Sequence, residues 1–303
     1  MTTNHDDHTD TTGGSAPQTI TIGGDLSVGR IGFGAMQLTG KQVWGEYPDR
    51  PAAINLLRTA VDAGVTFIDT ADVYGPHTNE TLIREALHPY PEHLVIATKG
   101  GFVRGGFDYS TLGAVGNPNY LRQAAHTSAR RLGVERIDLY YLHSGRATDA
   151  PFEEQVATLA ALREEGVIRH IGLSNVTLDQ LRAAQGIAPI AAVTAHYNVA
   201  ARTGAGLLRA AEESGAVFSP WHPVRFDETG ETEKITAVLT PIAHRHGATN
   251  QQIALAWHLH SSPASLPIPG TTSPAHLADN LAAAGIALTA EEVAAITALA
   301  PEA

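Results

Sequence analysis

The segment RPAAINLLRTAVDAGVTFIDT, residues 50–70, sets the pattern that most of the chain follows. Its first part has apolar residues at helical spacing, with Pro51 near the start and Gly64 just past the end, as helices prefer. Its last part, TFIDT, is a short apolar run typical of a buried β-strand. The segment therefore predicts a helix followed by a strand of a parallel sheet.

Runs of the same two kinds alternate through the rest of the chain. Capping-box pairs start three of the helix-like runs, namely Thr177 with Gln180, Thr249 with Gln252 and Thr289 with Glu292. The strand-like runs are residues 30–36, 66–70, 94–98, 137–143, 168–174, 190–196, 216–221 and 265–270. Eight such β-then-α units predict a closed (β/α)8 TIM barrel of the α/β class. The alternative, an open doubly wound sheet, usually has fewer strands.

Four side chains with matching chemistry lie at or just beyond the ends of three successive strands. Asp69 and Tyr74 occur in IDTADVYG, Lys99 in VIATKGG and His143 in IDLYYLHS. Barrel active sites lie at the C-terminal ends of the strands, which is where these residues fall. A Lys close to a Tyr is expected to lower the phenol pKa, the carboxylate to hold the Lys, and the His to orient a carbonyl oxygen. The set suits proton delivery to an oxygen while a second reagent attacks the carbon.

Composition excludes several classes of protein. The 303 residues include no cysteine, so disulfides and thiolate metal sites are excluded and a reducing compartment is expected. The formal net charge of -11 argues against general nucleic-acid binding. No apolar run reaches membrane-spanning length and no signal-peptide pattern is present, so we expect a soluble, cytoplasmic protein.

The N-terminal part of the chain differs from the rest. Residues 1–17 are polar, acidic and contain glycine, and they are predicted to form a disordered tail. The sequence TITIGGDLSV that follows has two alternating stretches about Gly23, Gly24 and Asp25, which predicts a β-hairpin. We therefore expect a tail and one barrel domain, residues 18–303, with the hairpin closing the bottom of the barrel.

The chain resembles the aldo-keto reductases over nearly all of residues 18–300. The motifs that carry this resemblance are GFGAMQLTG, FIDTADVYG, VIATKGG, RIDLYYLH, IRHIGLSN, the pair YN at residues 197–198, and LPIPGTTSPAHLADNLAAA. More narrowly, MQLTGKQVWGEYPDR and FSPWHPV resemble a bacterial branch that includes pyridoxal reductases. The resemblance implies a reductase of aldehydes or ketones in which Tyr74 is the general acid, Lys99 lowers its pKa, Asp69 pairs with Lys99 and His143 positions the substrate oxygen.

The resemblance also implies NADPH as the source of hydride, because side chains supply none. Ser174 and Asn175 match the pair that hydrogen-bonds the carboxamide, and Trp221 matches the ring that stacks on the nicotinamide. The start of the helix after residue 270 suits phosphate, and two later residues of this helix match contacts to the adenine. The residues assigned to the cofactor are Gly34, Ala35, Met36, Asp69, Ser174, Asn175, Thr194, Trp221, His222, Pro223, Val224, Arg225, Ile268, Gly270, Thr271, Thr272, Ser273, His276, Asp279 and Asn280.

Some of these positions depart from the family pattern. Thr194 stands where many members have Gln, and because Thr is shorter we expect one carboxamide hydrogen bond to be missing or mediated by water. His276 stands where many NADPH-selective members have Arg, and Gly270 where one branch has Lys. Loss of fixed positive charge weakens affinity for a 2′-phosphate. We still expect NADPH, through Thr272 and His276, with NADH as the alternative. Arg225 is either a contact to the pyrophosphate or a loop charge.

The expected substrate pocket is aromatic, formed by Trp44, Tyr74, Phe102, His143 and Trp221. It predicts a small, planar or aromatic carbonyl compound, with pyridoxal the first to test. The family also implies a monomer. Two other functions remain open: a barrel that senses nicotinamide redox state for a protein partner, and an aldolase in which Lys99 forms a Schiff base.

No metal site is expected. The histidine pairs His244 with His246, and His258 with His260, lie two apart on helices, so their rings point to different faces and are read as surface or packing residues.

Overall fold

The central sheet has seven parallel strands in the order β11-β10-β9-β8-β5-β4-β3. The structure, a computed structural model, describes residues 18–226 and 230–301. The predicted tail lies outside these residues, so the division into a tail and one domain stays a prediction. The strands are β3 (Phe33–Gly34), β4 (Phe67–Asp69), β5 (Val95–Gly100), β8 (Ile137–Leu142), β9 (Ile168–Ser174), β10 (Ile190–His196) and β11 (Val217–Trp221).

The two edges of this sheet are joined by the eighth predicted strand, residues 265–270, which closes the barrel. The bonds that close it are Phe218 N to Ala264 O (2.8 Å), Leu266 N to Phe218 O (2.8 Å), Gly32 N to Pro267 O (2.9 Å) and Gly34 N to Pro269 O (3.2 Å). The prediction of a regular strand here is wrong, because the segment makes one isolated bridge, Phe218 to Ser265. Pro267 and Pro269 have no N–H to donate, so the ladder cannot continue.

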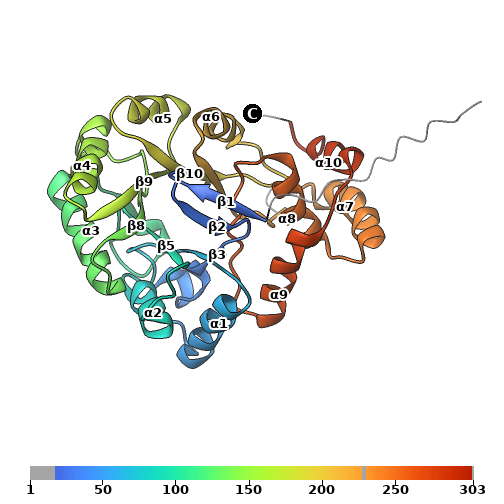
Figure 1. Ribbon diagram of the computed structural model, residues 1–303, viewed down its shortest axis with the longest axis horizontal. Helices are drawn as coiled ribbons and strands as arrows, with labels where there is room; N and C mark the ends of the chain where they lie inside the picture. The colour runs from blue at the N-terminus through green and yellow to red at the C-terminus, as the bar shows by residue number, and fades with distance from the viewer. Residues whose placement is uncertain (1–17, 227–229, 302–303) are drawn as a thin grey trace, which may run out of the picture.

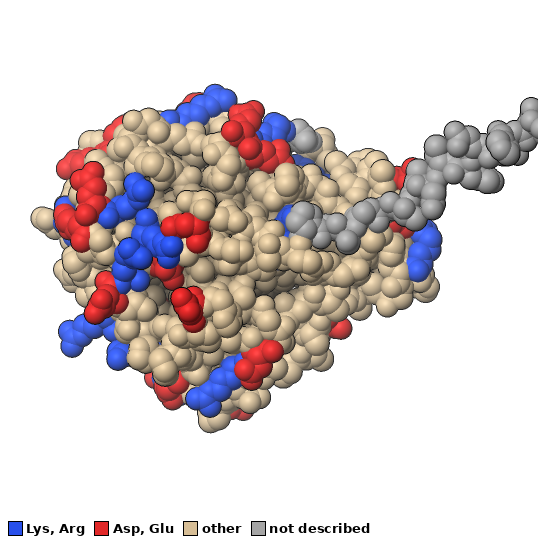
Figure 2. Space-filling model, viewed as in Figure 1, with Lys and Arg blue, Asp and Glu red and all other residues tan. Residues whose placement is uncertain are grey.

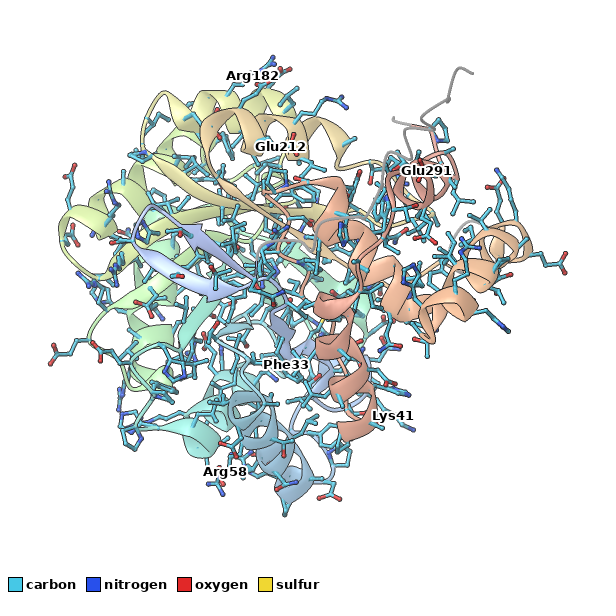
Figure 3. The ribbon with its side chains drawn as sticks, turned by 45° about the vertical axis from the view of Figure 1, so that its right-hand side comes forward. Phe33, Lys41, Arg58, Arg182, Glu212 and Glu291 are labelled. Carbon is cyan, nitrogen blue, oxygen red and sulfur yellow. The ribbon has the colours of Figure 1, made fainter. Side chains whose placement is uncertain are left out.

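Helices surround the strands, as Figure 1 shows. In Figure 3, Phe33 lies inside this ring, whereas Arg58, Arg182 and Glu212 lie on its outer helices. Phe33 is fully buried and the other three are exposed. The helices are α1 (Arg50–Asp62), α2 (Thr78–Leu87), α3 (Pro118–Leu132), α4 (Phe152–Glu164), α5 (Leu178–Gln185), α6 (Ala205–Ser214), α7 (Thr232–His246), α8 (Asn250–Ser261), α9 (Pro274–Ala282) and α10 (Ala290–Thr297).

The predicted helix ends are present. Thr177, Thr249 and Thr289 accept from the backbone N–H three residues on, and the side chain at that position accepts in return, so all three capping boxes form. Pro51 lies in the first turn of α1, and Gly64 has a φ of 97° just past the end of this helix. These signals are local, which is why the sequence alone places them well.

The predicted hairpin pairs β1 (Thr19–Ile22) with β2 (Leu26–Gly29) and lies across the middle of the ring in Figure 1. Ile22 is fully buried against the barrel interior, in one cluster with Phe67 and Leu139. At its turn, Asp25 accepts from Arg169 (2.8 Å), at the N-terminal part of β9. The hairpin therefore closes the end of the barrel opposite the strand ends that carry Asp69 and Lys99.

A second hairpin follows β5 and was not predicted. It pairs β6 (Phe102–Arg104) with β7 (Leu112–Ala114). Arg104 donates to the carbonyls of Val43 (3.2 Å) and Phe107 (2.7 Å), and its guanidinium lies between the rings of Trp44 (5.2 Å) and Tyr109 (5.1 Å). Arg104 thus ties this hairpin to the loop after β3.

Acidic and basic side chains are intermixed on the face shown in Figure 2. Within the described ranges, no helix is both long enough and apolar enough to cross a membrane.

Candidate active site

An ion pair between Lys99 and Asp69 forms the base of the site. Nζ of Lys99 bonds Oδ1 of Asp69 and donates to the carbonyl of Thr70 at 2.8 Å. The side chains are 4% and 5% exposed, respectively. Because β4 and β5 are paired in parallel, Asp69 lies opposite Ala97, two residues before Lys99. Adjacent strands therefore deliver an acid and a base to one point.

The turn after β4 is fixed to its surroundings before it reaches Tyr74. Asp72 N donates to the carbonyl of Lys99 (3.1 Å), and Thr70 Oγ1 donates to Oδ1 of Asn79 (2.6 Å). The amide of Asn79 in turn donates to the carbonyls of Ala35 and Leu38, both at 2.9 Å. This network holds the turn between β5 and the loop after β3.

Tyr74 and His143 lie above the ion pair. Nζ of Lys99 is 5.4 Å from the centroid of the Tyr74 ring. The rings of Tyr74 and His143 are 6.0 Å apart, edge to face, and the ring of Phe102 lies 4.7 Å from that of His143. The structure therefore brings together all four predicted catalytic residues.

The surroundings shift the pKa values of these groups in opposite directions. Burial, followed by the charge of Asp69, raises the pKa of the Tyr74 phenol well above its ordinary range, although part of this side chain is open to the cavity. Burial, followed by the charge of Lys99, lowers the pKa of His143 well below its ordinary range. The net shift at Tyr74 is thus upward, against the lowering that we expected from Lys99. Near neutral pH the site holds a protonated phenol and a neutral imidazole.

A cavity of about 1180 Å³ opens over this group. Sites for small ligands typically have volumes of a few hundred to a thousand Å³, so it can take a ligand together with part of a second one. Buried polar atoms without a hydrogen-bond partner among the described residues are present on three of its lining residues: Oδ2 of Asp69, Nδ1 of His143 and Nε1 of Trp221. Groups of this kind are expected where a ligand completes the hydrogen bonding.

Most residues expected at the cofactor line the cavity. They are Gly34, Met36, Asp69, Ser174, Asn175, Thr194, Trp221, His222, Pro223, Val224, Arg225, Ile268 and Gly270. The others lie outside its lining: Ala35 is buried beneath, and Thr271, Thr272, Ser273, His276, Asp279 and Asn280 are in or just before α9. α9 begins at Pro274, four residues after Gly270, which lines the cavity.

The residues predicted for the substrate pocket also include some that line the cavity and one that does not. Tyr74, Phe102, His143 and Trp221 line the cavity. Trp44 lies outside the lining, half-buried against Arg104, whereas its neighbours Gln42 and Val43 take part in the lining.

Strands β10 and β11 form one wall of the cavity. The hydroxyl of Thr194 on β10 donates to the carbonyl of Ser219 on β11 at 2.6 Å, so it already has a partner within the sheet. Next to it, the ring of His196 stacks on Trp221, with the centroids 4.5 Å apart and the planes at 20°. Asn175, at the end of β9, has a φ of 53° and donates to Oγ of Ser174 at 2.8 Å.

Several lining residues were not predicted from the sequence, namely Gln37, Gln42, Val43, Val73, Leu112, Arg146 and Pro269. The signal for Arg146 was available, because it follows His143 by three residues in a loop after a barrel strand. Gln42 and Val43 offered the same signal, because they lie in the loop after β3 and precede Trp44, which was predicted to line the pocket.

The paired histidines serve other purposes. His258 is buried and its Nε2 lies 3.2 Å from the carbonyl oxygen of Pro223, whereas His246 pairs with Glu292 at 2.9 Å. Across the described part of the chain, no group of three or more metal-binding side chains is arranged to hold an ion.

Comparison with known proteins adds an independent finding. The family model described as "Aldo/keto reductase family" matches residues 30–301. The chain is 41% identical to pyridoxine 4-dehydrogenase of Escherichia coli over 278 residues, 90% of this chain and 95% of that protein. Among solved structures, it matches a thermostable aldo-keto reductase in complex with the inhibitor epalrestat (TM-score 0.82, 29% identity, 93% and 99% coverage). It also matches an aldo/keto reductase of Klebsiella pneumoniae in complex with NADP and acetate (TM-score 0.76, 25% identity, 93% and 95% coverage).

Proposed function

The chain belongs to the aldo/keto reductase family, and we propose that it reduces an aldehyde or ketone to the alcohol with Tyr74 as the proton donor. It is an NAD(P)H-dependent oxidoreductase. The observation that carries the proposal is the convergence of Asp69, Lys99, Tyr74 and His143 on one cavity. These are the groups needed to protonate an oxygen while hydride reaches the carbon.

The cofactor is NADPH, in line with the NADP bound to the Klebsiella relative. The cavity fits it in size and chemistry, because Ser174 and Asn175 offer side-chain hydrogen-bonding groups and the ring of Trp221 offers a stacking surface. Thr271, Thr272 and Ser273 precede α9, and His276 lies in its first turn, so this helix end would hold phosphate. When bound, NADPH supplies the hydride.

Tyr74 would deliver the proton. Its raised pKa keeps the phenol protonated near neutral pH, so the donor is present whenever substrate arrives. Once the proton has left, the phenolate lies next to the ammonium of Lys99, which is 5.4 Å from the ring centroid. The attraction between these two charges lowers the cost of the transfer.

His143 would hold the substrate oxygen beside the phenol. Its lowered pKa leaves a neutral ring with one N–H, which donates a hydrogen bond without competing as an acid. Asp69 fixes Lys99 and balances its charge at a point where both side chains are almost fully buried. The same pairing argues against a Schiff-base role for Lys99, because an ion-paired ammonium is a poor nucleophile.

The substrate is proposed to be planar or aromatic, possible examples being pyridoxal and its relatives. Tyr74, Phe102, Tyr109 and Trp221 supply rings to the cavity wall. The Escherichia coli relative is named for an alcohol of this type.

The monomeric state and the cytoplasmic location remain predictions. No observation favours the alternative of a redox sensor with a protein partner.

The test uses the full chain with NADPH and a panel of pyridoxal, benzaldehyde and short aliphatic aldehydes. Loss of NADPH absorbance and formation of the alcohol are followed together. We expect the ring-bearing aldehydes to be reduced with the higher kcat/KM. Reduction of aliphatic aldehydes alone would contradict the substrate class, and failure to reduce any carbonyl compound would overturn the function.

A further inference from the structure

The cavity carries more positive than negative side chains, although the whole chain has a formal net charge of -11. Its described lining includes Lys99, Arg146 and Arg225, and a single acidic residue, Asp69. Asp69 is already paired with Lys99. A positively charged cavity in an acidic protein favours a negatively charged occupant. NADPH is negatively charged and would account for part of this excess of cations. The position of each cation therefore indicates whether it would bind NADPH or the substrate.

Arg146 belongs to the same loop as His143. In this loop, Gly145 N donates to the carbonyl of Asn175 (3.3 Å), and the amide of Gln180 donates to the carbonyl of Gly145 (2.7 Å). A side chain at position 145 would collide with Gln180, since an added Cβ would come within 2.2 Å of Oε1. The loop is therefore held against the start of α5, and the backbone of Arg146 has a fixed position.

The guanidinium of Arg146 is also oriented. Its Nε donates to Oγ of Ser144 at 3.3 Å, and its Cζ lies 5.7 Å from the centroid of the Phe102 ring. Phe102 is itself buried, and its carbonyl accepts from the hydroxyl of Tyr120 at 2.8 Å. The hydrogen bond of Nε and the neighbouring ring restrict the orientation of the guanidinium and leave its terminal N–H groups available to a ligand.

Those terminal groups have no partner in the described part of the chain. Neither Nη1 nor Nη2 of Arg146 forms a hydrogen bond or an ion pair with any residue of 18–226 or 230–301. Some arginines elsewhere in these ranges do have acidic partners, for example Arg122 with Glu165 at 2.8 Å. Arg146 is thus a cation that lines the cavity and is not neutralised by a neighbouring acid.

Arg146 lies on the side of the cavity where the substrate is expected. It follows β8 and contacts Phe102, which follows the adjacent strand β5 and lies 4.7 Å from the ring of His143. The groups proposed to hold the far parts of NADPH follow β11 and residues 265–270, where the two edges of the sheet are joined, whereas β8 and β5 lie in the middle of the sheet order. A ligand whose carbonyl oxygen reaches His143 and Tyr74 would bring its distal end past Phe102 toward Arg146.

We propose that Arg146 binds an anionic group on the carbonyl substrate, so that the preferred substrates are ring-bearing aldehydes or ketones with a carboxylate or phosphate. This inference rests on the proposed reductase function. The guanidinium offers two parallel N–H donors, which match the oxygens of either anion. Because Arg146 is exposed to solvent, its contribution is screened by salt.

The experiment compares matched aldehydes at saturating NADPH. One pair is 4-carboxybenzaldehyde with 4-methylbenzaldehyde, and the other is 4-formylphenyl phosphate with 4-methoxybenzaldehyde. We expect the anionic member of at least one pair to have the higher kcat/KM, and that advantage to decrease as salt is added. Arg146→Ala should lower the anionic-to-neutral ratio of kcat/KM about tenfold, mainly through KM. The pair with the larger loss identifies the anion.

Two variants control for other effects of the substitution. Arg146→Lys retains the charge without the planar fork, so it should keep part of the ratio. Arg122→Ala removes an arginine that lies outside the cavity lining and should leave the ratio unchanged.

Three results would overturn the inference. The first is a wild-type ratio near one that Arg146→Ala does not alter, in which case the reductase function stands. The second is an equal loss for both members of a pair together with weaker NADPH binding, which would assign Arg146 to the cofactor. The third is that none of the four aldehydes is reduced by the wild type, in which case the proposed function fails as well.

Discussion

The ammonium of Lys99 lies 5.4 Å from the centroid of the Tyr74 ring. The same ammonium is ion-paired with Asp69 below the ring. The phenol starts as a neutral group, because burial and the charge of Asp69 raise its pKa. Its conjugate base would appear next to a cation that is already in place, so no charge has to move when the proton leaves.

Replacing Tyr74 by Phe should therefore remove the proton donor and retain the ring. We expect kcat for carbonyl reduction to decrease by about 10² to 10⁴-fold, the usual contribution of a positioned acid. The dissociation constant for NADPH, measured by quenching of tryptophan fluorescence, should change little. Normal turnover by Tyr74→Phe would refute the role of this residue.

The pair of Asp69 and Lys99 should also contribute to stability. Both side chains are almost fully buried, so loss of one partner leaves an unpaired charge in a site with little water. Asp69→Asn should lower the free energy of unfolding by about 3 kcal/mol, as found for broken buried pairs. Urea unfolding at neutral pH measures this quantity.

A double-mutant cycle separates this effect from simple damage to packing. Asp69→Asn combined with Lys99→Met removes both charges and should be less destabilised than the sum of the single variants. If the destabilisation of the double variant equals the sum for the two single variants, the two charges do not stabilise each other.

The pH dependence of reduction should lack a histidine step. The pKa of His143 is lowered well below its ordinary value and that of Tyr74 is raised, so neither group titrates between about pH 6 and 8. We expect kcat/KM to be flat with respect to both groups over this interval. An inflection near pH 6.5 that disappears in His143→Gln would contradict the neutral state of His143.

Local patterns allowed much of this site to be predicted from the sequence. Asp69, Tyr74, Lys99 and His143 follow apolar strands whose order along the chain is also their order in the sheet. Parallel strands direct their C-terminal ends to one edge, so the meeting of these residues required no long-range information. The capping boxes at Thr177 and Thr289 are equally local.

The remaining features depend on contacts between distant segments. Trp44 was assigned to the substrate pocket, but Arg104 from an unpredicted hairpin covers its ring. The raised pKa of Tyr74 depends on how deeply the folded chain buries the phenol, which spacing along the chain does not encode. Residues 265–270 have an apolar strand pattern, yet Pro267 and Pro269 prevent a full ladder.

The buried His258 should make the protein sensitive to acid. Burial, opposed by its bond to the carbonyl of Pro223, lowers the pKa of His258 from 6.5 to about 3. Between pH 6.5 and pH 3 the unfolded chain therefore binds a proton that the folded chain does not, so stability decreases as the pH falls through this interval. At pH 5 this single group accounts for about 2 kcal/mol.

His258→Gln keeps an N–H donor for Pro223 and removes the titration. The difference in unfolding free energy between pH 7 and pH 5 should therefore be smaller by about 2 kcal/mol than in the wild type. His126→Gln, at an exposed position on α3, serves as the control and should retain the wild-type difference. Equal pH dependence in His258→Gln and the wild type would show that His258 is not the acid-sensitive group.

The last prediction concerns the choice between NADPH and NADH. His276 is an exposed residue in the first turn of α9, the helix that begins four residues after Gly270 of the cavity lining. His276→Arg should place a permanent cation where the 2′-phosphate is expected. We expect the ratio of the dissociation constants for NADH and NADPH to rise about tenfold, as a charge-assisted contact provides.

Ala278→Arg adds the same charge at another exposed position of α9 and should change this ratio much less. Parallel fluorescence titrations with the two nucleotides give the ratio for each variant. If the two variants shift the ratio equally, the effect is one of overall charge, and the 2′-phosphate does not lie at position 276. If neither variant shifts it, the nucleotide binds away from this helix end, and the expectation for Thr272 is wrong together with that for His276.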